Sequence, residues 1–379
     1  MYSRSTQMVK KISLIKSKKL FKSAKKIIPL ASQTFSRSYL FFDKNYFPLF
    51  IKRGKGQYVY DLDNNKYLDL ISGLGSVSIG YANQIILNSV IRETRNGNTF
   101  SLASPLEVDL ARKLKKIIPS AEMIRYGKNG TDVNSAAIRL ARYYTKKNHI
   151  AVCGYHGWQD WYIASTTMSG GVPELNEKYV HTFEYNNLPS LENIFKRFKI
   201  AAVIMEPLSY SLPKKNFLKN IKNLCHKNKS LLIFDEICTG FRVSLGGAQK
   251  IYNVKPDIST FGKGMANGYP LSIIAGKKKV MKKLEEIFYS GTFAGEVSSI
   301  AACSATIDFM KKNKVIEKNT LKGKFLEKSL KKLISRYKLE DIIKIDGHPT
   351  WLFLRVKEKY NFSKELMLLI RQELIKNKI

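Results

Sequence analysis

The stretch LLIFDEICTGFR, residues 231–242, runs from a short apolar segment straight into two adjacent carboxylates and then to an arginine. Its first five residues have the composition of a buried strand, and so do HIAVC (149–153) and AAVIME (201–206). Residues 132–147 and 216–228, which adjoin these segments, have the apolar periodicity of helices. Short continuous apolar strands joined by helices predict an α/β fold with a mostly parallel sheet covered on both faces.

Ligands bind beyond the carboxyl ends of the strands in such a sheet, and Glu206, Asp235 and Glu236 stand at these ends. A buried aspartate at a strand end is more often a helix cap than a ligand contact. Lys263 changes this interpretation, because STFGKGMANGYP (259–270) places it in a glycine-flanked turn after another short strand. A strand-end carboxylate and a loop lysine are the pair that pyridoxal phosphate (PLP) requires. The lysine forms a Schiff base, and the carboxylate keeps a proton on the pyridine nitrogen.

The sequence also offers a phosphate site. RYGKNGTDVNSAAIRLAR (125–142) places Asn129, Gly130 and Thr131 directly before an amphipathic helix. The N–H groups and the positive end of that helix favour a bound anion. Taken alone, these residues make an ordinary N-cap. Together with the carboxylate and the lysine they predict a complete PLP site.

The composition restricts the class of protein. With 379 residues, 44% of them hydrophobic, the chain can form one large domain and a smaller one. It has no uncharged apolar run of about 18 residues or more, so we expect no membrane-spanning helix. The four cysteines are scattered singly, which favours neither a disulfide framework nor a metal site. The sequence therefore predicts a cytoplasmic globular protein with reduced thiols and no bound metal.

The formal net charge of +35 is the strongest feature of the composition. Lysines occur in nearly every expected surface segment, without an arginine-rich block and without the interleaved aromatic residues that stack on bases. The favoured interpretation is a solvated lysine surface with no specific nucleic-acid partner. Non-specific binding to polyanions at low salt is the alternative.

The first 42 residues contain no acid, and this composition overlaps that of an organelle transit peptide. Apolar residues at helical spacing favour instead an amphipathic helix over residues 17–28 that ends before Pro29. Further on, YVYDLDNNKYLDL (58–70) alternates apolar and polar residues on both sides of the turn at 63–65. This pattern predicts a β-hairpin outside the main sheet.

These residues resemble the class III aminotransferases, which are PLP-dependent enzymes of fold type I. They are most similar to the glutamate-1-semialdehyde 2,1-aminomutase branch and its aminotransferase relatives. The likeness runs from about residue 17 to the end, and its most specific part is the long match from Asp235 through TGFR to Lys263. The other matching stretches are LFKSAKKIIP, PLFIKRGKGQYVYDLDNNKYLDL, NGTDVNSAAIRLAR, CGYHG, MEP and SGTFAGE.

The resemblance implies a particular division of the chain. Residues 73–306 would form the large PLP-binding domain, and residues 17–72 and 307–379 would form a smaller α+β domain from both termini. Residues 1–16 would be a basic extension. The family continues past the helix expected over 363–378, so we expect the C-terminal part of the small domain to be incomplete.

The resemblance also implies roles for the central residues. Lys263 would form the Schiff base and would shuttle a proton between the two ends of the imine. Asp235 would bind the pyridinium nitrogen. Tyr155 and Ile237 would lie on opposite faces of the ring, with His156 beside the tyrosine.

Other site residues are expected further from the ring. Gly130 and Thr131 would hold the phosphate. Gly291 and Thr292 resemble a segment that reaches the phosphate of the neighbouring subunit, which implies a homodimer with shared active sites. Glu206 would support the cofactor site or would be purely structural, and the same alternatives apply to Glu236.

Two activities follow from the resemblance. An aminotransferase would move an amino group between a small amino donor and a small aldehyde or keto acceptor, whereas an aminomutase would make a tetrapyrrole precursor. Arg37 is out of register with the arginine that serves the substrate carboxylate in the aminomutase, and Ala266, Asn267 and Gly268 replace a glycine triplet after the lysine. These differences favour transamination. The alternative of another class is a truncated, non-catalytic PLP-binding or polyanion-binding protein.

Overall fold

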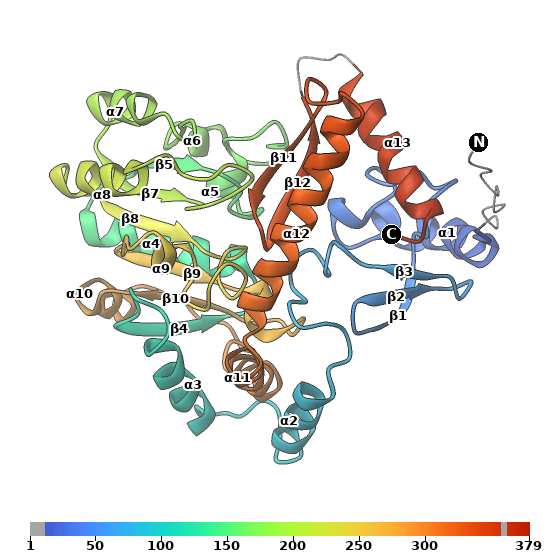
Figure 1. Cartoon of the computed structure of the whole chain (residues 1–379). Helices are drawn as coiled ribbons and strands as arrows, with labels where there is room; N and C mark the ends of the chain where they lie inside the picture. Colours follow the sequence, from blue (N-terminus) through green and yellow to red (C-terminus); the bar gives the residue numbers. More distant parts are fainter. Residues whose placement is uncertain (1–11, 358–361) are drawn as a thin grey trace.

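The computed structural model describes residues 12–357 and 362–379. A seven-stranded sheet forms its centre (Figure 1). In spatial order the strands are β4 (Met123–Gly127), β10 (Ser272–Gly276), β9 (Ile258–Phe261), β8 (Leu231–Asp235), β7 (Ile200–Met205), β5 (His149–Cys153) and β6 (Val180–Thr182). Strand β10 pairs antiparallel with both of its neighbours, and the remaining pairs are parallel. The predicted mostly parallel sheet is confirmed, and the three strands expected from the sequence lie side by side as β8, β7 and β5.

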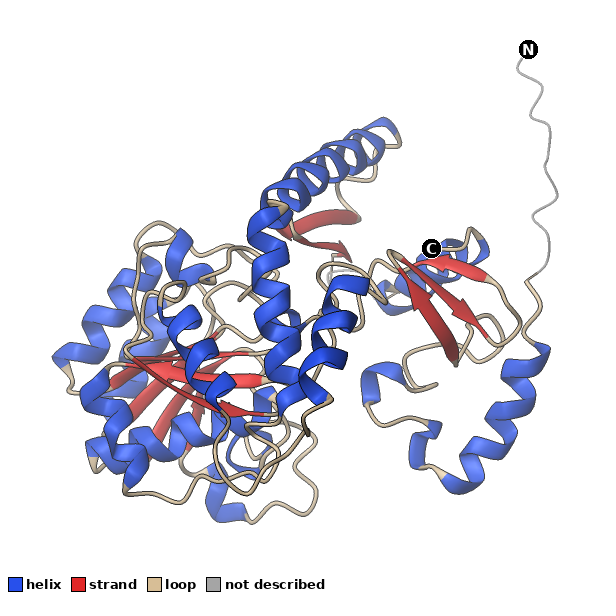
Figure 2. Ribbon diagram, turned by 90° about the horizontal axis from the view of Figure 1, so that it is seen from below, coloured by secondary structure: helices blue, strands red, loops and turns tan. Residues whose placement is uncertain are grey.

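Alternation of side chains along each strand explains why both faces of the sheet are covered. In β8, Ile233 packs in the cluster that includes helix α4 (Gly130–Thr145), while Phe234 packs in the cluster that includes α8 (Phe217–Lys227). The helices α3 (Pro105–Lys115) and α11 (Val297–Lys312) cover β4 and β10 in a third cluster. Figure 2 shows helices on both sides of the sheet.

Two helices of the large body begin at local caps. Helix α3 starts with a capping box between Ser104 and Glu107 and ends at Lys115, although helical periodicity in the sequence continues to residue 119. Helix α4 starts at Asn129, whose N–H donates to the Asp132 carboxylate at 2.7 Å. It ends where Lys146 adopts a left-handed conformation with φ of 56°.

The N-terminal part of the chain forms a separate layer. Helix α1 (Ile15–Ile27) lies beside the sheet of β1 (Ile51–Lys55), β2 (Tyr58–Asp61) and β3 (Lys66–Leu68). The predicted hairpin is confirmed as β2 and β3. Helix α1 begins earlier than expected because the Asp63 carboxylate in the hairpin turn accepts the N–H groups of Lys16 and Ser17 at 3.1 and 3.3 Å. Most of the predicted basic extension, residues 1–11, lies outside the described residues.

The C-terminal part returns to this layer. It consists of α12 (Val315–Arg336), β11 (Ile343–His348), β12 (Trp351–Val356) and α13 (Ser363–Lys376). The Leu68 N–H of β3 donates to the Lys378 carbonyl at 2.8 Å. Both ends of the chain therefore contribute to the smaller α+β part. The two-stranded sheet of β11 and β12 lies between the seven-stranded and the three-stranded sheets (Figures 1 and 2).

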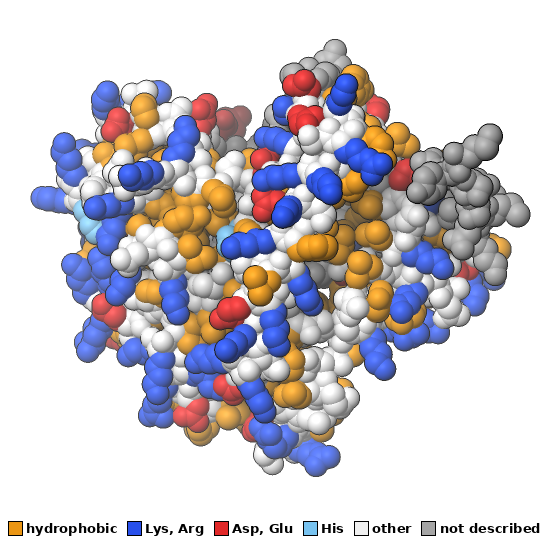
Figure 3. All heavy atoms as spheres, viewed as in Figure 1, with side chains coloured by type: hydrophobic (Ala, Val, Ile, Leu, Met, Phe, Trp, Pro, Cys, Tyr) orange, Lys and Arg blue, Asp and Glu red, His pale blue; other side chains and the backbone are white. Residues whose placement is uncertain are grey.

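The remaining elements are short or peripheral. They are α2 (Gln84–Thr94), α5 (Asp160–Ile163), α6 (Glu174–Glu177), α7 (Leu188–Arg197), α9 (Ala248–Ile251), α10 (Lys278–Met281) and the 3₁₀ turns η1 (Pro29–Ala31), η2 (Phe35–Arg37), η3 (Lys263–Ala266) and η4 (Lys282–Glu285). Within the part of the chain that the structure describes, none of the helices has both the length and the apolar composition of a membrane span. Figure 3 shows lysine and arginine side chains scattered over the visible face.

A glycine joins α12 to the two-stranded sheet. A Cβ added at Gly323 would overlap the carbonyl oxygen of Pro349 in the turn between β11 and β12. In an exposed helix, alanine would be favoured over glycine by about 1 kcal/mol. We expect Gly323→Ala to destabilise the protein instead, by roughly 1–3 kcal/mol, because the overlap involves backbone atoms that cannot rotate away.

Thermal unfolding of Gly323→Ala and of Gly170→Ala tests this packing. Gly170 has open space where its Cβ would lie, so Gly170→Ala should leave the melting temperature within experimental error of wild type. A melting temperature for Gly323→Ala equal to or above that of wild type would contradict the close approach of α12 to the turn.

Candidate active site

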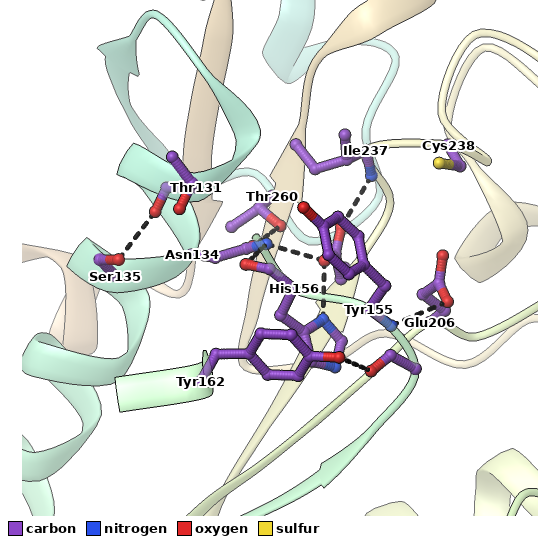
Figure 4. A network of polar contacts seen from close by, with 12 residues as sticks. Thr131, Asn134, Ser135, Tyr155, His156, Tyr162, Glu206, Ile237, Cys238 and Thr260 are labelled. Atoms are coloured by element: carbon purple, nitrogen blue, oxygen red, sulfur yellow. Dashed lines mark hydrogen bonds and ion pairs between the residues drawn. The ribbon is translucent and has the colours of Figure 1, made fainter. Parts of the chain in front are cut away.

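The carboxylate of Asp235 ends strand β8 and is almost completely buried, with 3% of the residue exposed. Its Oδ2 accepts the Asn134 amide at 2.8 Å and lies 2.8 Å from Nδ1 of His156. Its Oδ1 accepts the Ile237 N–H at 3.1 Å. Figure 4 shows these side chains gathered around the end of the strand. The network therefore joins β8 to α4 and to the loop after β5.

Asn134 has a fixed orientation in this network. Its Oδ1 accepts the Thr260 hydroxyl of β9 at 2.7 Å, so its amide nitrogen faces Asp235 and the His156 carbonyl. Sequence reasoning missed both Asn134 and Thr260. The available signal was a polar residue on the apolar face of α4, where Asn134 is 2% exposed between buried Val133 and Ala136.

The charge of Asp235 is only partly compensated by the chain itself. An ionised carboxylate can accept about four hydrogen bonds, and within the described residues Asp235 accepts three contacts, only one of them at Oδ1. In this part of the chain no lysine or arginine nitrogen lies within 4.0 Å of it. Burial of a carboxylate without full compensation is costly. A protonated ring nitrogen would supply both a donor and a positive charge, so Asp235 fits the pyridinium of PLP.

Lys263 begins the η3 turn directly after β9, at a left-handed backbone position with φ of 45°. Its Nζ lies 2.6 Å from Sγ of Cys238. Burial lowers the pKa of Lys263, but Cys238, Asp235 and Glu206 more than offset this effect, so the net pKa lies above the ordinary value. The charge of Asp235 therefore acts on the Lys263 ammonium.

Cys238 is a neighbour that sequence reasoning treated only as one of four scattered thiols. Burial raises the pKa of Cys238, and the nearby Lys263 only partly opposes this. The thiol is therefore neutral at neutral pH and accepts a hydrogen bond from the lysine. Its position three residues after Asp235 was visible in the sequence, but its contact with a residue 25 positions away was not.

The start of α4 packs tightly against the end of β8. A Cβ at Gly130 would lie 3.1 Å from the side chain of Ile237, and a Cβ at Gly157, which has φ of +109°, would overlap Oγ1 of Thr131. The first N–H groups of a helix have no intrahelical acceptor. Gly130 and Thr131 therefore present such groups beside the carboxylate network, as a phosphate site requires.

Tyr155 and His156 follow β5 and differ in exposure. Tyr155 is 64% exposed, and its ring meets Tyr162 edge-on at a centroid distance of 5.8 Å. His156 is 1% exposed, and within the described residues its Nε2 has no hydrogen-bond partner. Ile237 is 8% exposed. An exposed aromatic ring and a small aliphatic side chain near one carboxylate are suited to the two faces of a flat ring.

The two glutamates at the strand ends differ in role. Glu206 accepts the Tyr155 N–H at 3.3 Å, and burial, together with the charge of Asp235, raises its pKa to about 7. Glu236 turns the other way and accepts the N–H groups of Ala248 and Gln249 at 2.7 and 2.8 Å, which caps α9. Asp235 and Glu236 are adjacent in the sequence, but only Asp235 faces the site, whereas Glu236 has a structural role as the cap of α9.

Gly291 and Thr292 do not join this network within the chain. They are exposed and line a separate hollow of about 260 Å³ together with Arg125 and Tyr126. None of the residues around Asp235 lines that hollow.

Comparisons with known proteins identify the family of this chain. The family model "Aminotransferase class-III" matches residues 41–373. The 3-aminobutyryl-CoA aminotransferase of Cloacimonas acidaminovorans is 37% identical over 86% of this chain and 80% of its own length. The glutamate-1-semialdehyde 2,1-aminomutase of Wigglesworthia glossinidia brevipalpis is 36% identical over 92% of this chain and 85% of its own length.

Among solved structures, the PLP internal aldimine form of the Sphingopyxis sp. MTA144 FumI protein is similar, with a TM-score of 0.85 and 26% identity. The similarity covers 90% of this chain and 84% of that one. The resemblance inferred from the sequence and the fold type I architecture are thus confirmed. The chain belongs to the class-III aminotransferase family and is a PLP-dependent enzyme.

Proposed function

We propose that this enzyme transfers an amino group from a small amino donor to a separate aldehyde or keto acceptor, and that Lys263 is the lysine that binds PLP. The observation that carries the proposal is the buried Asp235 carboxylate, which has an acceptor position to spare and whose charge acts on Lys263. The named activity of the relative from Cloacimonas acidaminovorans supports transamination.

Different residues of the chain would hold different parts of the cofactor. Asp235 would keep the ring nitrogen protonated, because a carboxylate beside that nitrogen raises its pKa. Gly130 and Thr131 would hold the phosphate at the start of α4, with Asn129 as the cap. Tyr155 and Ile237 would enclose the ring from its two faces, and His156 would hold the carboxylate in place. When bound, PLP supplies a carbonyl that condenses with amines and a ring that withdraws electrons.

Lys263 and Glu206 would handle protons. Nζ of Lys263 would take the proton that leaves the amino-bearing carbon of the donor and would deliver it at the other end of the transfer. Glu206 is an additional proton-holding group at neutral pH, since its pKa lies at about 7. Cys238 would limit the positions that the lysine nitrogen can occupy.

Transamination is favoured over intramolecular amino exchange by the surroundings of the site. Arg37 is the nearest candidate for the carboxylate-binding arginine of the aminomutase. It is exposed in η2, and its charge acts to lower the pKa of Tyr81, which is not part of the Asp235 network. The aminomutase remains the second candidate, because the relative from Wigglesworthia glossinidia brevipalpis matches 92% of this chain.

We also infer a homodimer with shared active sites. Apolar side chains are exposed around the hollow that contains Gly291 and Thr292. Phe100 is 50% exposed, Leu102 85% and Phe293 59%. An exposed apolar patch of this kind is typical of an interface between protein chains. A second copy seated here could bring Gly291 and Thr292 to the phosphate end of the first copy's site.

We propose a cytoplasmic location as well. All four cysteines carry free thiols, and Cys225, Cys238 and Cys303 lie inside the large body. Reduced thiols are typical of proteins from a reducing compartment.

Borohydride reduction tests the assignment of the lysine. The PLP-loaded enzyme should absorb visible light, and reduction followed by peptide mass spectrometry should place the label on Lys263. Lys263→Ala should lose both the label and essentially all transfer activity, whereas Lys219→Ala, at an exposed position on α8, should behave like wild type. A label on another lysine in wild type would contradict the assignment.

A second experiment separates the two activities. If a donor amine bleaches the enzyme and an external keto acid restores its colour, transamination is supported. Turnover of glutamate semialdehyde without release of a keto acid would identify an aminomutase.

The raised pKa of Glu206 predicts a pH dependence of stability. The folded protein holds the proton up to about pH 7, whereas the unfolded chain releases it near the ordinary value, so stability falls as pH rises between these values. Glu206→Gln removes this dependence and should stabilise the protein above pH 7 by on the order of 1–3 kcal/mol. Near pH 4 the two melting temperatures should converge. Exposed Glu174→Gln is the control, and a constant difference between wild type and Glu206→Gln across this range would contradict the prediction.

The dimer predicts an effect of Leu102→Asp. A buried aspartate at the centre of the apolar patch should dissociate the dimer, because an unpaired charge is costly at an interface. Sedimentation velocity should show twice the chain mass for wild type and the single-chain mass for Leu102→Asp, with PLP affinity reduced by roughly tenfold or more. Leu321→Asp, at a residue 68% exposed on α12, is the control. A monomeric wild type with full activity would contradict shared active sites.

A further inference from the structure

Loop 72–80 lies against the turn that carries Lys263 and has an unusual backbone. Five of its residues have positive φ, and two of them, Ser72 and Leu74, are not glycine. Left-handed conformations at such residues cost free energy. The hydroxyl of Ser78 is buried, and within the described residues it has no hydrogen-bond partner. The loop therefore requires compensating interactions to hold this conformation.

Asn267 supplies three of these interactions from the end of the Lys263 turn. Its Oδ1 accepts the N–H groups of Ser78 and Ile79 at 2.9 and 3.0 Å, and its Nδ2 donates to the Gly80 carbonyl at 3.0 Å. Asn267 itself is left-handed with φ of 46°, a conformation that asparagine tolerates better than most residues. The amide side chain thus pairs with the backbone of the loop on both sides.

The middle of the loop lies close to Lys263. A Cβ at Gly75 would lie 3.9 Å from Cδ of Lys263 and 3.4 Å from the guanidinium of Arg242, which donates to the Gly75 carbonyl at 2.9 Å. A Cβ at Gly264 would overlap the Ser78 hydroxyl. The loop forms a wall along the lysine stem, and Cys238 lies at the lysine nitrogen.

We propose that Asn267 is a positioning residue for Lys263. It holds loop 72–80 as the wall that keeps the lysine stem directed at the site, and Arg242 anchors the same loop at Gly75. This inference rests on the proposed role of Lys263. It explains why asparagine stands where the glycine triplet of the aminomutase would be, since a glycine there has the required backbone freedom but no side chain to hold the loop.

The test compares two substitutions at one position. Asn267→Gly keeps the left-handed backbone and removes all three hydrogen bonds. Asn267→Asp keeps the acceptor for Ser78 and Ile79, loses the donor to Gly80 and places a carboxylate oxygen near the Gly80 carbonyl. Asn253→Gly is the matched control, because Asn253 is also left-handed, with φ of 51°, but is exposed in the turn after α9.

Four measurements are made on the PLP-loaded enzymes. They are hydrogen–deuterium exchange of peptides covering residues 75–80, the fraction of Lys263 labelled by borohydride, kcat and donor KM at saturating PLP, and melting temperature. For Asn267→Gly we expect exchange in 75–80 to rise by on the order of tenfold or more, as loss of three hydrogen bonds implies. We expect kcat to fall by roughly tenfold with an unchanged donor KM. Asn267→Asp should recover part of both effects, because the hydrogen bonds at Oδ1 are kept, and Asn253→Gly should match wild type.

The outcomes separate this inference from the proposed function. Faster exchange in 75–80 with unchanged kcat and labelling in Asn267→Gly would overturn the positioning role, since the loop would then have only a structural effect. Equal losses in Asn267→Gly and Asn267→Asp would overturn the role of the Oδ1 hydrogen bonds. If wild type carries its label on a lysine other than Lys263, the proposed function fails first, and this inference fails with it.

Discussion

The buried charge of Asp235 is the constraint on which the arrangement of the site depends. A carboxylate that is 3% exposed must obtain its hydrogen bonds from the protein. Here the donors come from α4, from the loop after β5 and from the backbone two residues on, while β9 fixes the orientation of Asn134. The network therefore fixes the relative positions of β8, α4, the loop after β5 and β9, which are far apart in the sequence. Their polar groups meet at the carboxyl ends of the parallel strands.

Close approach of backbones makes this arrangement around Asp235 possible. Gly130, Gly154 and Gly157 lie where a Cβ would meet Ile237, Glu206 and Thr131, respectively. The start of α4 can therefore lie against the end of β8, and the loop after β5 can turn back over both. These glycines therefore serve the packing that brings the three segments together around the carboxylate.

The sequence predicted the parts of the fold and site that depend on local pattern. The apolar strands, the helix after Asn129 and the position of Asp235 at a buried strand end follow from periodicity and strand ends. The missing parts depend on contacts across long separations. Asn134 meets Asp235 across 101 positions, and Asp63 caps α1 from 46 or 47 positions away, so no local window contains either partner. Helix ends such as Lys115 depend on tertiary packing.

The buried acids show why Asp235 differs from an ordinary structural carboxylate. Within the described residues the buried acids are Asp61, Asp235, Glu236, Asp257 and Glu296. Asp257 and Glu296 pair with lysines at 2.5 and 2.6 Å. In the same part of the chain Asp61 and Glu236 have no lysine partner, but both oxygens of each carboxylate accept hydrogen bonds from N–H groups or a hydroxyl.

Asp235 alone in this group has a single donor on one oxygen and no lysine or arginine within ion-pair distance in the described chain. In a chain with 65 lysines and arginines and 30 acids, a cation for this site would have been easy to supply. The incomplete hydrogen bonding of Asp235 therefore distinguishes it from the other buried acids, and a protonated ring nitrogen would supply the missing donor and a positive charge. The proposed contact would give an acid-poor protein a physical reason to place a carboxylate at the end of a fully buried strand.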